Sequence, residues 1–249
     1  MPENPVCQIC AAADPAPFLT HRGMEIVRCR RCGFTWLHPL PTAATVAAMY
    51  TDAYAGTTEG YFSKVDKKLR RSRARARMLA GLMPKRASRP RLLDVGASGG
   101  FLVEAAREAG FDATGVELDP ASIAYARTHY PQNTFVQGTV EDFARGNPDT
   151  WFDAVYCSEV IEHVTDANSF VAAIAALMPA NAVLYMTTPD IGHWRRPRDI
   201  TKWDAFDPPS HCLYFDGRTL PLLLEKHGFT NIRRRFAWKP GVKVVARRR

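Results

Sequence analysis

Between residue 91 and the C-terminus, apolar and polar positions alternate between two patterns. Short, nearly continuous apolar runs predict buried strands, and longer stretches with apolar residues every three or four positions predict helices. The expected strands are Arg91–Val95, Ala113–Glu117, Thr134–Gln137, Asp153–Cys157 and Ala182–Thr187, and the expected helices are Phe101–Glu108, Ala121–Thr128, Asp166–Met178 and Leu220–His227. Strands and helices in this alternation favour a doubly wound, mostly parallel sheet with helices on both faces.

Two further strands complete the expected sheet. Segments near Ile232–Ala237 and Val242–Ala246, joined by the turn residues Lys239-Pro-Gly241, are typical of an antiparallel hairpin at a sheet edge. The sequence therefore predicts an α/β fold with a seven-stranded sheet over residues 91–249.

The residues before this sheet divide into two parts. Residues 41–90 contain two helical patterns, Thr42–Tyr50 and Ser63–Met83, and are interpreted as a helical connector or lid. Residues 1–40 are interpreted as a small ribbon that a bound metal, rather than an apolar core, holds together.

Four of the six cysteines predict what that metal is. They form two pairs, Cys7-Gln-Ile-Cys10 and Cys29-Arg-Arg-Cys32, separated by 18 residues. This spacing is typical of a four-thiolate zinc site, because each two-residue gap lets both thiolates of a turn reach one tetrahedral ion. Two disulfides are the alternative, which a reducing compartment disfavours. Four thiolates leave no open coordination position, so the predicted zinc is structural.

The composition excludes several classes of protein. With 249 residues, of which 46% are hydrophobic, the chain can bury a core, and intrinsic disorder, collagen and coiled coil are excluded. The longest apolar run, Phe170–Pro179, is too short to span a bilayer. Because the N-terminus lacks the basic and apolar regions of a secretory signal, we expect a cytoplasmic protein.

The formal net charge of +8 is concentrated in four basic clusters. They are Lys67–Arg77, Lys85–Arg91, Arg233–Arg235 and Arg247–Arg249. Such an excess can indicate binding to nucleic acid or anionic surfaces. We find neither interleaved aromatic residues nor an RNA-binding motif, so solvated faces, a linker and a tail are the preferred interpretation, and nucleic acid is not expected as a partner.

The first predicted strand runs into a loop of small residues, Leu93-Asp-Val-Gly-Ala-Ser-Gly-Gly-Phe101, ahead of a helix. Such a loop lets a ligand approach the backbone beside a helix N-terminus. Glu117 ends the next strand, 21 positions after Gly96, where a carboxylate can bind both hydroxyls of a ribose. Ser98 and Phe101 stand where a dinucleotide fingerprint requires glycine, and no Gly-Lys-Ser/Thr is present for a nucleoside triphosphate.

These motifs resemble those of class I S-adenosylmethionine-dependent methyltransferases. The resemblance rests on Asp94–Gly100, Gly115–Pro120 and Trp151–Val164. Within the family the chain is most similar to small-molecule methyltransferases of the ubiquinone-biosynthesis O-methyltransferase type, and some relatives that act on sugars and natural products carry a similar cysteine ribbon. The resemblance implies a Rossmann-like methyltransferase sheet and S-adenosylmethionine as cofactor. Ser98 departs from the family, which often has glycine there.

Carried over to this sequence, the family's cofactor contacts fall at the ends of the predicted strands. The resemblance implies that the methionine part lies along the loop residues Asp94, Gly96, Ala97, Ser98 and Gly100. It implies that Glu117 binds the ribose hydroxyls and that the adenine is surrounded by Leu118, Val140 and Glu141. It also implies that the sulfonium lies beside Cys157, Ser158 and Glu159. Leu118 and Val140 are equally compatible with ordinary core positions, and Cys157, like Cys212, with a small buried residue.

Methyl transfer to a hydroxyl requires a base that removes its proton. Glu159, Glu162 and His163 are spaced to share one helical face, where the resemblance to quinone O-methyltransferases makes a divalent cation conceivable, although capping or packing is the commoner role. His211 lies in the long loop Pro189–Asp216, which emerges at the ligand-binding edge of the sheet. We expect His211 to be the general base, with His163 as the second candidate and Glu159 beside the reaction.

The same loop contains Trp194, Trp203 and Phe206, which can form a lid over an apolar acceptor. We expect methyl transfer to a small molecule, at a hydroxyl, in a natural-product, sugar or quinone pathway. Cys157-Ser-Glu-Val160 replaces the Asn/Asp-Pro-Pro-Tyr/Phe motif of methyltransferases that act on adenine or glutamine amides. Two alternatives stay open: an RNA methyltransferase that uses the ribbon and the arginine clusters, and a binding module whose methyltransferase fold is catalytically idle. The sequence names neither the acceptor nor the oligomeric state.

Overall fold

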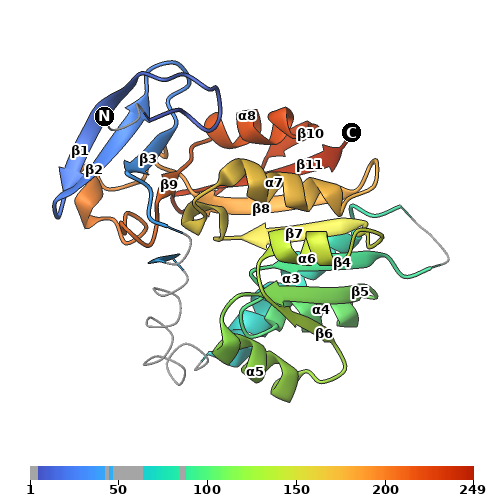
Figure 1. Cartoon of the computed structure of the whole chain (residues 1–249). Coiled ribbons are helices and arrows are strands. Elements are labelled where there is room, and N and C mark those ends of the chain that lie inside the picture. Colours follow the sequence, from blue (N-terminus) through green and yellow to red (C-terminus); the bar gives the residue numbers. More distant parts are fainter. Residues whose placement is uncertain (1–4, 43–44, 47–63, 85–87) are drawn as a thin grey trace.

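The computed structural model describes residues 5–42, 45–46, 64–84 and 88–249, and its centre is a seven-stranded sheet (Figure 1). The strands lie in the order β10-β11-β8-β7-β4-β5-β6. Their bounds are β4 Arg91–Val95, β5 Asp112–Glu117, β6 Thr134–Gln137, β7 Ala154–Ser158, β8 Val183–Pro189, β10 Phe229–Arg234 and β11 Gly241–Arg248. Strands β4 to β8 are parallel, whereas β11 is antiparallel to both β8 and β10. The predicted doubly wound, mostly parallel sheet is confirmed.

Helices cover both faces of this sheet. Successive residues of β4 alternate between two apolar clusters, so that Leu92 packs with helices α3, α4 and α5, and Leu93 packs with α6, α7 and α8. The bounds of the helices are α3 Val65–Ala80, α4 Phe101–Glu108, α5 Pro120–His129, α6 Val140–Gly146, α7 Ala167–Ala176 and α8 Thr219–Lys226. Aspartate side chains cap two of them, because Asp119 accepts a hydrogen bond from the backbone of α5 and Asp166 accepts two from α7.

The edge hairpin differs from its prediction in position. Strand β10 begins at Phe229, separated from helix α8 only by His227 and Gly228, and its register with β11 shifts between Thr230 and Arg233. The expected helix Thr42–Tyr50 lies largely outside the described residues. Among the described residues, no helix is long and apolar enough to cross a membrane.

A second, smaller sheet joins the N-terminal segment to the main domain. Its order is β1-β2-β3-β9, with bounds β1 Pro15–His21, β2 Met24–Cys29, β3 Thr35–His38 and β9 Leu213–Tyr214. Strand β9, which the sequence pattern does not predict, comes from the long loop after β8 and pairs antiparallel with β3. The ring centroids of Phe34 and Phe215 lie 5.1 Å apart in the same apolar core cluster, so the cysteine-bearing segment shares the core of the sheet domain.

Candidate active site

The glycine loop between β4 and α4 has the backbone shape that its sequence predicts. Gly96 and Gly100 have φ angles of 78° and 79°, in the left-handed region that favours glycine. A Cβ on Gly96 would overlap the side chain of Val160, and one on Gly100 would lie 2.7 Å from the ring of Phe135. Ser98, the residue that departs from the family pattern, also has a positive φ of 48°. The loop therefore turns back tightly before α4 begins.

Glu117 connects this loop to the end of β5. Its Oε2 accepts a hydrogen bond from the N–H of Ser98 at 2.8 Å, and its Oε1 accepts one from the N–H of Asp119 at 2.9 Å. Burial raises the pKa of Glu117, and these N–H donors oppose the increase. The structure thus brings together the acid and the loop that two separate motifs predicted.

The carboxyl of Asp94 lies behind the loop and is 4% exposed. Burial, together with the nearby charge of Glu117, raises the pKa of Asp94 to about 8. Because two acids lie together in a largely desolvated place, a bound cation would favour the ionised form of both.

The residues expected around an adenine lie at the start of α6 and just after β5. Val140 is 2% exposed and packs in the apolar core, as the alternative interpretation of that residue allowed. Leu118 is partly exposed, and burial raises the pKa of Glu141. These three positions lie at the carboxyl edge of the sheet, on the same side as the glycine loop.

At the end of β7, three side chains form a chain of hydrogen bonds. The Thr187 hydroxyl donates to Oε1 of Glu159 at 2.8 Å, and it therefore accepts from the Ser158 hydroxyl, also at 2.8 Å. Glu159 has a φ of 58°, which directs its side chain toward β8. Cys157 is completely buried, and burial raises the pKa of its thiol well above the usual range, so this side chain is an inert part of the core.

The two predicted candidate bases lie against each other. The rings of His163 and His211 have centroids 4.4 Å apart and meet at 84°. Each Nδ1 donates to a backbone carbonyl, that of Ser210 for His163 at 2.9 Å and that of Ala205 for His211 at 2.8 Å. A carbonyl can only accept, so in the neutral form of each ring Nε2 carries the lone pair. Burial and the proximity of His211 lower the pKa of His163 to about 4, which keeps that ring neutral at pH 7.

Glu162, rather than Glu159, lies close to the two histidines. One ligand atom each from Glu162, His163 and His211 lies within 4.8 Å of the other two. The expected helical face does not form, because Glu159 precedes the short 3-10 helix Ile161–His163 and bonds to Thr187 instead. Oε2 of Glu162 accepts from Thr188 at 2.8 Å, and its Oε1 has no partner among the described residues.

The long loop after β8 is fixed to the small sheet rather than open. The Cys212 N–H donates to the carbonyl of Glu162, and the Cys212 carbonyl accepts from Leu37 of β3. Phe206, one of the expected lid residues, is 4% exposed and packs against Tyr214, and Trp203 packs beside the same cluster, so neither is an open lid. A strand of two residues gives no periodic signal, so the sequence does not predict β9.

The four cysteines of the N-terminal segment lie together. Sγ of Cys7 is 3.5 Å from Sγ of Cys32, and Sγ of Cys10 is 3.4 Å from Sγ of Cys29, and all four are free thiols. Thiolates on a tetrahedral zinc ion, with Zn–S of about 2.3 Å, lie about 3.8 Å apart. The cluster therefore fits zinc after an expansion of a few tenths of an ångström.

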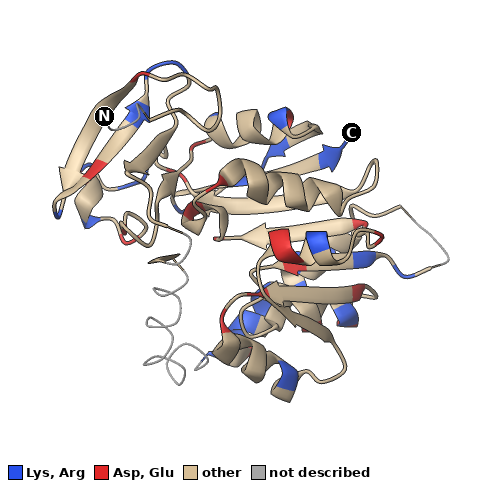
Figure 2. Cartoon of the chain, viewed as in Figure 1, with Lys and Arg blue, Asp and Glu red and all other residues tan. Residues whose placement is uncertain are grey.

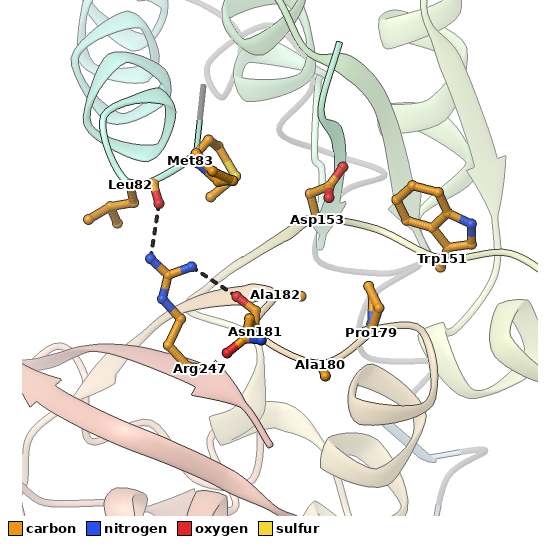
Figure 3. Close-up of a pocket in the computed structure, with 10 residues that line it drawn as sticks. Leu82, Met83, Trp151, Asp153, Pro179, Ala180, Asn181, Ala182 and Arg247 are labelled. Atoms are coloured by element: carbon orange, nitrogen blue, oxygen red, sulfur yellow. Dashed lines mark hydrogen bonds between the residues drawn. The ribbon is translucent and has the colours of Figure 1, made fainter. Parts of the chain in front are cut away.

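A cavity of about 640 Å³ lies at the opposite edge of the sheet (Figure 3). Leu82, Trp151, Asp153 and Arg247 are among its lining residues, at the amino ends of the central strands. Arg247 donates to the carbonyls of Asn181 and Leu82 at 2.9 and 3.0 Å, so its guanidinium joins chain segments. This cavity is separate from the site that contains Glu117.

Comparison with known proteins defines the class that this fold and site represent. A family described as a methyltransferase domain matches residues 61–234, and the chain belongs to this family. A ubiquinone biosynthesis O-methyltransferase from Vibrio cholerae is 35% identical over 102 residues, which cover 39% of this chain and 41% of that protein. A similar protein from Xanthomonas campestris is 36% identical over 39% of the chain and 42% of its own length. The chain thus spans about two fifths of the length of these relatives.

Solved structures of methyltransferases share the fold. A SAM-dependent methyltransferase from Archaeoglobus fulgidus superposes with a TM-score of 0.61 at 17% identity, over 76% of this chain and 100% of that chain. Burkholderia thailandensis 1,6-didemethyltoxoflavin-N1-methyltransferase, with bound 1,6-didemethyltoxoflavin and S-adenosylhomocysteine, has a TM-score of 0.58 at 18% identity, over 93% and 98%. Magnesium protoporphyrin IX methyltransferase from Synechocystis, with bound S-adenosylhomocysteine, has a TM-score of 0.60 at 13% identity, over 84% and 100%.

Proposed function

We propose that this chain transfers a methyl group from S-adenosylmethionine to a small-molecule acceptor, at the oxygen of a hydroxyl group. One observation carries the proposal: the carboxylate of Glu117 is bonded to the turn of the glycine loop at Ser98, at the carboxyl edge of a methyltransferase sheet. Membership of the methyltransferase-domain family supports the reaction. The match to ubiquinone O-methyltransferases supports an oxygen acceptor.

The residues of this edge fit S-adenosylmethionine. Glu117 would accept hydrogen bonds from the ribose hydroxyls, the backbone of Gly96–Gly100 would lie along the methionine part, and Leu118 and Glu141 would border the adenine. When bound, S-adenosylmethionine supplies a methyl group that is already activated on a positively charged sulfur. The acidic pair of Asp94 and Glu117 suits that positive charge.

His211 would remove the proton of the acceptor hydroxyl. Its Nδ1 is committed to the carbonyl of Ala205, which fixes the ring and leaves the basic lone pair at Nε2. His163 stays neutral beside it at pH 7, because burial and the proximity of His211 lower the pKa of His163 to about 4. The neutral ring of His163 would therefore fix the orientation of His211 without placing a charge beside it.

The test is a labelled methyl-transfer assay against phenols, catechols, sugars and matched amines. We expect transfer to a hydroxyl acceptor, with a kcat roughly 10²- to 10⁴-fold lower in His211→Ala. The Kd for S-adenosylhomocysteine should be unchanged in this variant, because His211 has no place in the cofactor site. Equal losses of kcat and cofactor affinity would assign His211 a purely structural role, and transfer only to amines would refute the oxygen assignment.

A divalent cation at Glu162, His163 and His211 is a second way to activate the hydroxyl. The observation that favours it is the convergence of three ligand atoms within 4.8 Å, with one carboxyl oxygen of Glu162 lacking a partner among the described residues. A cation would acidify a bound hydroxyl directly. In that case Mg²⁺ or Mn²⁺ added to metal-depleted protein should restore activity, whereas under the general-base mechanism the added ion has no effect.

We also propose that the four clustered cysteines bind a structural zinc ion. Reduced thiols persist in the cytoplasm, where we propose that the protein is located. The ribbon would stabilise the loop that carries His211. Two rival functions are distinguished by binding measurements. Steep salt dependence of RNA binding would favour an RNA methyltransferase, and a lack of affinity for S-adenosylhomocysteine would favour a catalytically idle binding module.

A further inference from the structure

Three large aromatic side chains are exposed together at the carboxyl edge of the sheet. Trp194, Phe236 and Trp238 are 73%, 78% and 60% exposed. Trp194 belongs to the loop after β8, and the other two belong to the turn between β10 and β11. We refer to these three residues and Arg195 as the aromatic patch.

Ring contacts hold the aromatic patch together as one surface. Cζ of Arg195 lies 4.1 Å from the ring centroid of Trp238 and 5.1 Å from that of Trp194. The two indole rings meet at 90° with centroids 6.4 Å apart, and the ring of Phe236 lies 6.4 Å from that of Trp238. Two segments that are distant in the sequence therefore present their rings side by side.

His193 connects the two segments through the backbone. Its Nε2 donates to the carbonyl of Ala237 at 3.1 Å, and its Nδ1 accepts from the N–H of Arg195 at 3.1 Å. Gly241, just after the turn, pairs with Pro189 at the end of β8. These contacts preorganise the patch before any partner binds, which lowers the entropic cost of binding.

The surroundings of the patch are basic. Arg233, Arg234, Arg235 and Lys239 are exposed at the end of β10 and in the turn that follows, and the sequence contains no Asp or Glu from Phe229 to the C-terminus. The buried Asp190, at the end of β8, lies near Arg234 and His193. Figure 2 shows Lys and Arg in blue on β10, which ends in Arg233 and Arg234, whereas the blue end of β11 beside the C-terminus lies at the opposite edge of the sheet. The expectation that the basic clusters lack accompanying aromatic residues is therefore wrong for this cluster, because Phe236 and Trp238 follow it directly in the sequence.

We propose that the aromatic patch docks this protein onto an anionic lipid bilayer. Exposed tryptophan and phenylalanine rings are suited to the interface between head groups and acyl chains, and neighbouring arginines and lysines are attracted to anionic head groups. Single-stranded nucleic acid fits the patch less well, since bases need open ring faces on which to stack. Here Arg195 lies over both indoles, and His193 lies over Trp194 with ring centroids 5.8 Å apart.

Docking in this way would turn the carboxyl edge of the sheet toward the bilayer. Glu117 and Ser158 end their strands at this edge, on the same side as the turn that carries Trp238. An acceptor held in or at the membrane would then reach the proposed methyl-transfer site without crossing bulk water. The docking itself does not depend on the proposed reaction, so it can be tested without a substrate.

Cosedimentation of the full chain with lipid vesicles tests the proposal. We expect binding to equimolar phosphatidylglycerol and phosphatidylcholine at low salt, weaker binding at 0.5 M salt, and none to phosphatidylcholine alone. The double variant Trp194→Ala/Trp238→Ala should bind the anionic vesicles at least about tenfold more weakly. Trp151→Ala is the matched control, since Trp151 is 44% exposed but lies at the opposite edge of the sheet, and it should bind like the parent protein.

Thermal unfolding of each variant separates lost docking from lost folding, and the exposed side chains predict unchanged midpoints. Intrinsic fluorescence gives an independent readout, because inserted indoles shift their emission to the blue. The proposal is overturned if the parent protein does not bind anionic vesicles, or if the double variant binds them as well as the Trp151→Ala control does. Binding of a single-stranded RNA that vesicles fail to displace, with loss of affinity in the double variant, would also overturn it.

Discussion

Replacement of Glu117 tests the proposed cofactor site most directly. In Glu117→Ala the two carboxylate oxygens that accept from Ser98 and Asp119 are lost, together with the acceptors proposed for the ribose hydroxyls. A hydrogen bond to a charged group is worth about 1.5–3 kcal/mol, so the loss of two amounts to at least about 3 kcal/mol. This corresponds to about a hundredfold increase in the Kd for S-adenosylhomocysteine, which titration calorimetry measures.

Two further variants separate this effect from a general loss of structure. Glu117→Gln keeps the shape of the side chain, but its NH₂ must face one of the two backbone N–H donors, so its Kd should also rise. Glu225→Ala removes an exposed carboxylate of α8, and should leave the Kd unchanged. If Glu117→Ala bound within threefold of the parent protein while unfolding at the same temperature, the assignment of Glu117 to the ribose would be refuted.

Three other variants test the proposed zinc site, the buried acid and the glycine loop. Cys10→Ser should reduce bound zinc from about one equivalent and lower the melting temperature, as measured by metal analysis and thermal unfolding. Asp94 has its folded pKa raised from 3.8 to about 8, so the free energy of unfolding of the ligand-free protein should fall as pH rises from 4 to 8, by up to about 1.4 kcal/mol per pH unit. Asp94→Asn should flatten this dependence in urea titrations at pH 5 and pH 8, and an unchanged slope would contradict it. Gly100→Ala should cost about 1–3 kcal/mol of stability, because its Cβ would meet the ring of Phe135.

The central sheet was predictable because its signals are local. Each parallel strand is a short apolar run followed by a periodic helix, and burial on both faces leaves little freedom in that pattern. The residues of the proposed cofactor site could be predicted for the same reason, because the glycine loop and Glu117 come directly at the ends of predicted strands. The hydrogen bond between Ser98 and Glu117 then joins two features that the sequence placed separately.

The arrangement of the candidate bases could not be predicted in the same way. His163 meets His211 only because Cys212 bonds to the carbonyl of Glu162, and because β9 continues the small sheet beside β3. These are long-range contacts of a segment with no periodicity of its own. The choice of Glu162 over Glu159 depends on a single residue with a positive φ, a conformation that a glutamate gives no reason to expect.

The pairing of β3 with β9 has a consequence for how the protein is made. Strand β3 leaves the ribosome early, whereas its partner β9 follows only after the five parallel strands β4 to β8 have been synthesised. Until then the edge of β3 has no intramolecular partner in this sheet and resembles an open template for another chain. If the cysteines bind zinc as proposed, capture of the ion before β9 is synthesised would hold β2 and β3 in shape during this interval.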